Sequence, residues 1–361
     1  MLTKTIVATL LVIISSSVLH AAASITAVGQ TASVVLIGTL KGLENGAEAG
    51  YFTLTLSVAK TLKGLVYTSV VVAGLAPGDS YVTPSVLPNS LVGQTGIWFL
   101  SESGSGYQVI PTETGRILPN DVFLPVSDSL AAAGLSGTTE YQLLQYLVGW
   151  YRSLSNPTVR DDMKCLTSLQ SQSTSPEASL AAANSLIGSP AVASQIIGLA
   201  AAIGLGSDSA VAALSTSLHV VSKNPKFYLI TGALATSYQP HGVGSISVLK
   251  QIIDQHSAVP GIDAAVGAAL SKIVVKQTLP VMAELLNSSD PTAQLRAASF
   301  FGLFTLFADS NGNVSGGGPE GPLASDETRL YTPRRDSGVS PQQYSQFWRG
   351  WWAEHHTLLG L

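Results

Sequence analysis

The sequence predicts an α+β multidomain protein, in which a small all-β barrel or sandwich is followed by an all-α helical array. Two observations carry this prediction. Short segments rich in β-branched and aromatic residues fill residues 32–111, and from residue 139 the apolar period changes to that of helices. The chain has 361 residues, of which 46% are hydrophobic and 11% charged, so it can bury a core in each of two domains.

Residues 1–23 have the pattern of a secretory signal peptide. Lys4 is followed by an apolar run at 6–14 and by small residues at 21–23, which places cleavage after Ala23. The apolar run is too short for a membrane anchor, so we expect an exported protein, periplasmic or secreted, with no membrane span after cleavage. A net charge of -4 without a basic run argues against nucleic acid or anionic lipid as a partner. Cys165 is the single cysteine, and its spacing with Leu166 and Leu169 predicts burial rather than a disulfide.

Residues 24–111 are predicted to form the barrel domain. The candidate strands are 33–40, 51–58, 68–74, 97–100 and 107–110. The last two strands flank a turn at 101–106, where Gly104 and Gly106 can take positive φ.

The order of these segments, including 58–64 and 93–100, resembles the small exported OB-like barrels related to netrin and metalloproteinase-inhibitor modules. The resemblance implies a barrel. Those inhibitors act through an N-terminal cysteine, whereas this chain would start at Ser24 with no cysteine nearby. The resemblance therefore argues against that inhibitory mechanism.

Residues 112–137 carry several prolines and glycines and are predicted as a linker, and 138–308 as the helical array. After a first helix at 140–152, helices are expected to begin near 160, 176, 190, 208, 225, 244, 260, 278 and 291. Four of these starts carry a proline with a small residue seven positions later: Ala183, Gly232, Gly267 and Ala298. Proline suits the first helical turn, and a small residue lets a neighbouring helix approach closely.

Residues 278–303 resemble a HEAT repeat. The first helix would turn Leu279, Met282, Leu285 and Leu286 inward, and the second Leu295, Ala298 and Leu303, with Arg296 at a frequent basic position. Asp290 and Pro291 would form the turn between the helices. The resemblance covers roughly 160–308 and implies an α-solenoid with a protein-binding surface.

Residues 309–339 form a Gly/Pro-rich loop in this prediction. Asp309, Asn311, Asn313 and Glu320 copy part of the EF-hand spacing and are a weak calcium candidate. Val314 replaces the turn glycine and Pro319 precedes Glu320, so a plain turn-rich loop is favoured. No cofactor or other metal is expected, because the sequence holds no H-E-x-x-H pattern and the adjacent His355 and His356 would point about 100° apart on a helix.

Residues 340–361 are predicted to form a Trp-rich docking helix that Ser340 and Pro341 begin. Trp348, Trp351 and Trp352 share one face at helical spacing. Such a stripe is a structural anchor when it closes the end of the array, or a platform for a glycan or peptide when it is exposed.

The function predicted from these features is that of an exported, non-catalytic adaptor that binds another protein. The alternative is an inhibitor or regulator of a secreted hydrolase through the barrel, which exposed aromatic residues near Trp98 would favour. An enzyme of unrecognised type is the third and least favoured alternative. No G-x-S-x-G motif exists, and His241 has no carboxylate beside it in sequence. A buried polar cluster around His241 would favour that third reading.

Overall fold

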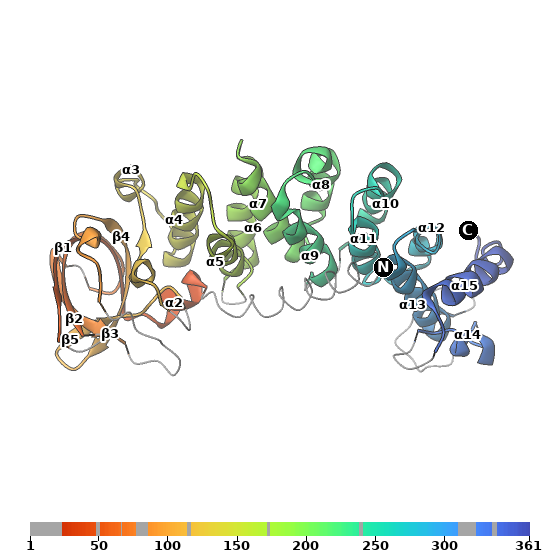
Figure 1. The fold of residues 1–361 in the computed structure, drawn as a ribbon, viewed down its shortest axis with the longest axis horizontal. Helices are drawn as coiled ribbons and strands as arrows, with labels where there is room; N and C mark the ends of the chain where they lie inside the picture. The colour runs from red at the N-terminus through yellow and green to blue at the C-terminus, as the bar shows by residue number, and fades with distance from the viewer. Residues whose placement is uncertain are drawn as a thin grey trace. The chain divides into compact units, whose positions relative to one another are not determined.

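The computed structural model describes residues 24–47, 51–65, 67–76, 86–113, 117–171, 174–237, 241–309, 323–333 and 338–361. It confirms the predicted fold class, a closed β-barrel followed by helices (Figure 1). The chain divides into two compact units, residues Met1–Ser194 and Gln195–Leu361. The predicted signal peptide at 1–23 lies outside the described residues.

The barrel is built from five strands, with a short sixth strand added to one of them. The strands are β1 (Val34–Asn45), β2 (Phe52–Lys63), β3 (Ser69–Leu75), β4 (Thr95–Ser103), β5 (Gly106–Val109) and β6 (Leu124–Pro125). The order is β1-β2-β3-β5-β4, and pairing of β1 with β4 closes the barrel. β3 and β5 are parallel and the other neighbours antiparallel. Each predicted strand corresponds to one of β1 to β5, and only Gly104 of the two turn glycines takes a positive φ, of 57°.

Alternation along the strands turns one set of apolar side chains into the barrel, including Leu36, Leu54, Leu56, Val72 and Leu100. Trp98 is fully buried among them, and its indole N–H donates to the Gly38 carbonyl at 3.0 Å. The Trp98 ring stacks on Phe123 with centroids 4.6 Å apart. A Cβ atom at Gly96 would overlap the Phe123 ring, so only glycine fits this position.

The segment predicted as a linker, 112–137, contains ordered elements that continue the barrel. A 3₁₀ turn, Pro119–Val122, leads into β6, which pairs with β4 at Gly96 and Ile97. A short helix, α3 (Asp128–Ala131), follows. Val122 and Phe123 are fully buried in the barrel core, so apolar burial holds this segment in place despite its prolines and glycines.

A helix that the sequence analysis did not anticipate precedes the barrel. In α2 (Ile25–Thr31), Ser24 is the N-cap and accepts a hydrogen bond from the Ala27 N–H. The Ile25 N–H donates to the Ser168 hydroxyl at 3.0 Å, and Ile25 is fully buried. α2 therefore packs on the first helices of the array, α4 (Thr139–Ser153) and α5 (Val159–Leu169), which with α6 (Pro176–Ile187) belong to the first unit.

The second unit stacks its helices in two rows (Figure 1). α8 (Asp208–Val221) contacts α10 (Ser245–His256), while α9 (Tyr228–Thr236) contacts α11 (Ile262–Leu270), which contacts α13 (Pro291–Phe307). The remaining helices are α7 (Val192–Gly204), α12 (Leu279–Leu285), α14 (Asp326–Leu330) and α15 (Pro341–His355). Every predicted helix start lies within three residues of an observed one.

The small residues of the proline-started helices have different roles. Ala183 and Ala298 are fully buried, and a Cβ at Gly267 would lie 3.2 Å from Leu285 Cδ1, so α11 and α12 approach closely there. Gly232 is exposed with no neighbouring atom within 4 Å of such a Cβ, so it marks no helix contact.

One inward position predicted for the second helix of the HEAT-like unit is wrong. Leu303 is 40% exposed, because Phe300, Phe301 and Phe304 occupy the buried face of α13. None of the helices within the described ranges combines the length and the apolar character that a membrane crossing needs.

Candidate functional site

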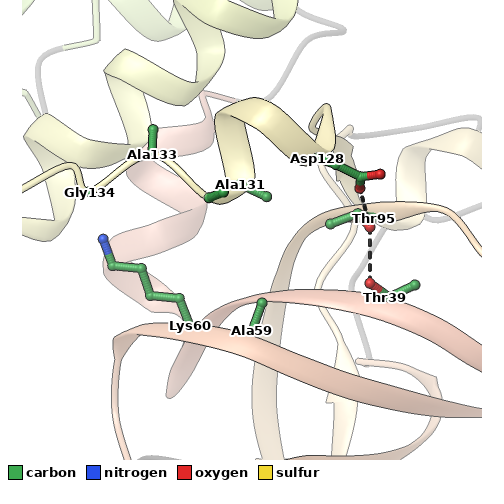
Figure 2. A pocket seen from close by; sticks show the side chains of 9 residues that line it. Thr39, Ala59, Lys60, Thr95, Asp128, Ala131, Ala133 and Gly134 are labelled. Atoms are coloured by element: carbon green, nitrogen blue, oxygen red, sulfur yellow. Dashed lines mark hydrogen bonds between the residues drawn. The ribbon is translucent and has the colours of Figure 1, made fainter.

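The candidate site is a cavity of about 450 Å³ on the outer wall of the barrel. Strands β1, β2 and β4 form its floor, and α3 with the residues after it forms its roof. Its lining consists of Thr39, Ala59, Lys60, Thr95, Asp128, Ala131, Ala132, Ala133 and Gly134. Figure 2 shows Lys60 at one side and the Thr39, Thr95 and Asp128 side chains at the other.

The cavity floor contains an irregularity of the sheet. Ile37 pairs with Lys60 and Gly38 with Val58, so Ala59 is an extra residue of β2, as in a β-bulge. Bulges re-aim the side chains beside them, which places both Ala59 and Lys60 on the cavity wall.

The roof is fastened to the barrel at both ends. Near its start, the Val126 N–H donates to the Thr95 carbonyl at 3.0 Å, and the Thr95 hydroxyl donates to Asp128 Oδ1 at 3.2 Å. At its end, Lys60 Nζ donates to the Leu135 carbonyl at 2.8 Å. The Leu130 side chain packs against Gly149 of α4 and so lies away from the cavity. The alanines at 131–133 line the roof instead.

A second polar cluster joins the barrel to α5. Lys164 Nζ lies 2.9 Å from Glu113 Oε1 and 3.6 Å from Asp121 Oδ1, and Arg160 lies 2.7 Å from Asp121 Oδ2. Glu113, Asp121 and Lys164 are all buried, and burial raises the pKa of Glu113 although the Lys164 ammonium opposes this. Sequence reasoning missed the cluster, and its one local sign is that Arg160 and Lys164 share a helix face at i, i+4.

A third cluster surrounds His241, whose side chain is fully buried. Asp208 Oδ1 accepts hydrogen bonds from the Ser245 hydroxyl at 2.6 Å and the Gly242 N–H at 3.1 Å, and His241 Nδ1 lies 3.5 Å away. Burial lowers the pKa of His241, against the attraction of Asp208. The carboxylate sought by the enzyme reading is present, but it lies between serine and imidazole, whereas a nucleophile relay places the imidazole between serine and carboxylate.

The tryptophans of α15 surround Phe301 of α13. Trp348 is fully buried, lies 5.7 Å from Phe301 between ring centroids, and donates its indole N–H to the Tyr331 carbonyl at 3.1 Å. Trp351 is 7% exposed and Trp352 is half-buried, and both rings make T-shaped contacts with Phe301, with ring centroids 5.9 Å apart. The stripe therefore faces α13.

Of the four calcium candidates, the structure describes Asp309. Asp309 is half-buried after α13, while Asn311, Asn313 and Glu320 lie outside the described residues. His355 and His356 each turn Nδ1 to a carbonyl one helical turn back, at 2.8 Å and 3.0 Å. Within the described ranges, no three histidine, cysteine or acidic side chains converge as metal ligands would.

Comparison with known proteins yields no relative: no protein-family model matches the chain, and neither the curated proteins nor the solved structures contain a match.

Proposed function

We propose that the protein is an exported, non-catalytic adaptor whose helical array binds another protein. The observation that carries the proposal is the stacking of helices in two rows, in which α8 contacts α10, α9 contacts α11, and α11 contacts α13. Stacked helical repeats expose long surfaces made of equivalent positions from successive helices, and such surfaces suit the binding of extended protein segments.

Two resemblances support this proposal at the level of fold. The strand order β1-β2-β3-β5-β4 with a parallel β3–β5 pair is the arrangement expected of an OB-like barrel. The pair α12 and α13 has the Asp290–Pro291 turn of a HEAT-like unit, with Asp290 as the N-cap. We take the array to be HEAT-like and the barrel to be an OB-like module that precedes it.

The packing of the polar clusters also supports an adaptor. Within the first cluster, buried Lys164 pairs with buried Glu113, and within the second, buried His241 lies 3.5 Å from Asp208, so the charged groups of each cluster face one another, which is a structural use of their chemistry. Trp98 itself lies inside the barrel, so its ring offers no contact surface for the alternative, an inhibitor that acts through the barrel. The Trp-rich helix α15, packed on α13, supplies the closed end that a helical array needs.

Site-specific photo-crosslinking in the organism's own cell envelope tests the proposal. Crosslinkers at the exposed positions Thr216 and Gln251 sample one row of helices, and Thr236 and Ser299 sample the other. Thr55, exposed on the barrel wall, is the matched control position. The captured protein is identified by mass spectrometry, purified and titrated against the purified chain.

We expect one exported protein to crosslink from positions of one row and to bind the purified chain. The absence of any exported crosslinked partner from all four array positions would overturn the adaptor proposal. Crosslinking from Thr55 alone would instead support regulation through the barrel. N-terminal sequencing of the exported protein should start at Ser24, and retention of residues 1–23 would contradict the export part of the proposal.

A further inference from the structure

The cavity on the barrel wall presents opposite charges on its two sides. Lys60 rises from β2 on one side, and Asp128 lies at the start of α3 on the other (Figure 2). An anion alone would be repelled by Asp128, and a cation alone by Lys60. A ligand that carries both charges meets an opposite charge at each end.

Each charged group retains bonding capacity after its protein contacts. An ammonium has three donors, and Lys60 Nζ gives two of them, to the Leu135 carbonyl at 2.8 Å and to Gln142 Oε1 at 3.0 Å. A carboxylate has about four acceptor sites, and Asp128 uses one of them for the Thr95 hydroxyl.

Two hydroxyls next to Asp128 form a hydrogen-bonded chain. Thr95 donates to Asp128, and its oxygen lies 2.9 Å from the Thr39 hydroxyl, so Thr39 donates to Thr95. Donation along this chain polarises the Thr39 hydroxyl and leaves its oxygen as an acceptor, in addition to the carboxylate acceptor sites of Asp128 that remain. This side of the cavity therefore suits an ammonium group.

Small side chains line the space between the charges. Alanine methyl groups and Gly134 leave about 450 Å³, within the range of about 300 to 1,000 Å³ that holds small-molecule ligands. The described lining has no aromatic ring for a sugar or a base to stack on. Methyl groups of this kind suit a short, weakly apolar ligand.

We propose that this cavity binds a small zwitterion of the amino-acid or dipeptide class, with its ammonium on Asp128 and its carboxylate on Lys60. The site belongs to the first unit, whereas the adaptor proposal rests on α8 to α13 of the second unit, so the two proposals stand independently. The roof of the cavity leads directly into α4, so occupancy would stabilise the connection between the barrel and the first helices.

Isothermal titration of the full chain with L-alanyl-L-alanine tests the proposal. Matched probes are the N-acetylated, the C-amidated and the doubly blocked dipeptide, with L-alanine as the smaller zwitterion. The variants are Asp128→Asn, which keeps an oxygen acceptor for Thr95, and Lys60→Met. Glu44→Gln and Lys41→Met, both exposed on β1 outside the cavity, are the matched controls.

We expect one dipeptide to bind per chain, and blocking either end to weaken binding at least about tenfold, as loss of a charged hydrogen bond does. Asp128→Asn should weaken binding of the unblocked dipeptide by a similar factor. It should weaken binding of the N-acetylated dipeptide little further, because the substitution and the acetylation remove the same contact. The same non-additivity should hold between Lys60→Met and C-amidation, while the control variants bind as the wild type does.

Three results would overturn the proposal. The first is no binding of either L-alanyl-L-alanine or L-alanine at millimolar concentration. The second is equal affinity for the free and the doubly blocked dipeptide, and the third is full additivity of Asp128→Asn with N-acetylation. Should Lys60→Met fail to fold because its contact with the roof is lost, Asp128→Asn alone decides the outcome.

Discussion

Replacement of Lys164 by methionine removes the ammonium that neutralises two buried carboxylates. Glu113 is 1% exposed and Asp121 is 7% exposed in their side chains, and Lys164 lies 2.9 Å from the first and 3.6 Å from the second. Removing one partner of a buried ion pair costs about 3–5 kcal/mol, because the other charge stays buried. Arg160 still contacts Asp121 at 2.7 Å, so we expect the low end, about 3 kcal/mol.

Lys250→Met is the matched control for this substitution. Lys250 Nζ also contacts two carboxylates, Asp254 and Glu284, each at 2.9 Å, but its side chain is 40% exposed. Exposed ion pairs contribute about 0–1 kcal/mol, so this variant should unfold much like the wild type. Both substitutions remove one cation and insert the same side chain.

Native-state hydrogen exchange measures the two costs separately, because Lys164 and Lys250 belong to different compact units. Loss of about 3 kcal/mol from the first unit should speed exchange of the α5 amides about 100-fold wherever exchange requires opening of that unit. Exchange in α10 should change little in Lys250→Met. Peptides from the other unit provide the internal reference in each variant.

The pH dependence of the Lys164→Met cost provides the refutation. Burial already raises the pKa of Glu113, and loss of the ammonium raises it further. A raised carboxyl pKa favours the folded state below the unfolded pKa, and this advantage is lost as pH rises through the folded pKa. The cost should therefore be smaller at acid pH than at neutral pH. A neutral-pH cost below about 1 kcal/mol, or one that does not change on acidification, would refute the reasoning.

Three further substitutions test other parts of the fold. Burial lowers the pKa of His241 from its usual 6.5, so its contribution to stability is complete above that value and is lost as pH falls through the folded pKa. His241→Gln should reduce the loss of stability at acid pH, whereas the same change at exposed His219 should not. Equal dependence of the unfolding free energy on pH in His241→Gln and the wild type would contradict this prediction. Gly96→Ala should lower the free energy of unfolding, measured in urea, by about 1–3 kcal/mol, because the new methyl group overlaps the Phe123 ring that stacks on Trp98. Gly106→Ala is the control and should lower it by less than about 0.5 kcal/mol, because its methyl group meets open space. Trp348→Ala should cost about 3–5 kcal/mol, seen as faster amide exchange in α13, and unchanged exchange there would show that α15 does not close the array.

The elements of this protein were largely predictable because their signals are local. Segments rich in β-branched and aromatic residues predicted β1 to β5, and prolines in the first helical turn predicted the starts of α6 and α15. These signals operate over a few residues and need no knowledge of distant partners. Leu303 shows the limit of such local signals. Its helical spacing is compatible with an inward position, but Phe300, Phe301 and Phe304 form the buried face of α13 and Leu303 is exposed.

The candidate sites were not predictable, because each depends on residues far apart in the chain. Glu113 lies about fifty residues before Lys164, and Asp208 lies 33 residues before His241. The cavity combines Thr39, Lys60, Thr95 and Asp128 from four separate segments. Ala59 is an extra residue only in comparison with the paired strand β1, so the sequence of β2 alone does not mark the bulge. A sequence pattern identifies neither which distant groups meet nor whether water separates them.

The sequence by itself determined which part of the chain forms the barrel strands and which part forms helices, because hydrophobic periodicity and capping are properties of neighbouring residues. Tertiary structure alone decided that the proline-rich stretch after residue 111 joins the barrel, since the Phe123 ring becomes apolar core only when it meets Trp98. It also decided that the tryptophans of FWRGWWAEHH face Phe301 and that opposite charges flank one cavity. Burial and charge pairing depend on contacts between residues far apart in the sequence, and those contacts exist only in the folded chain.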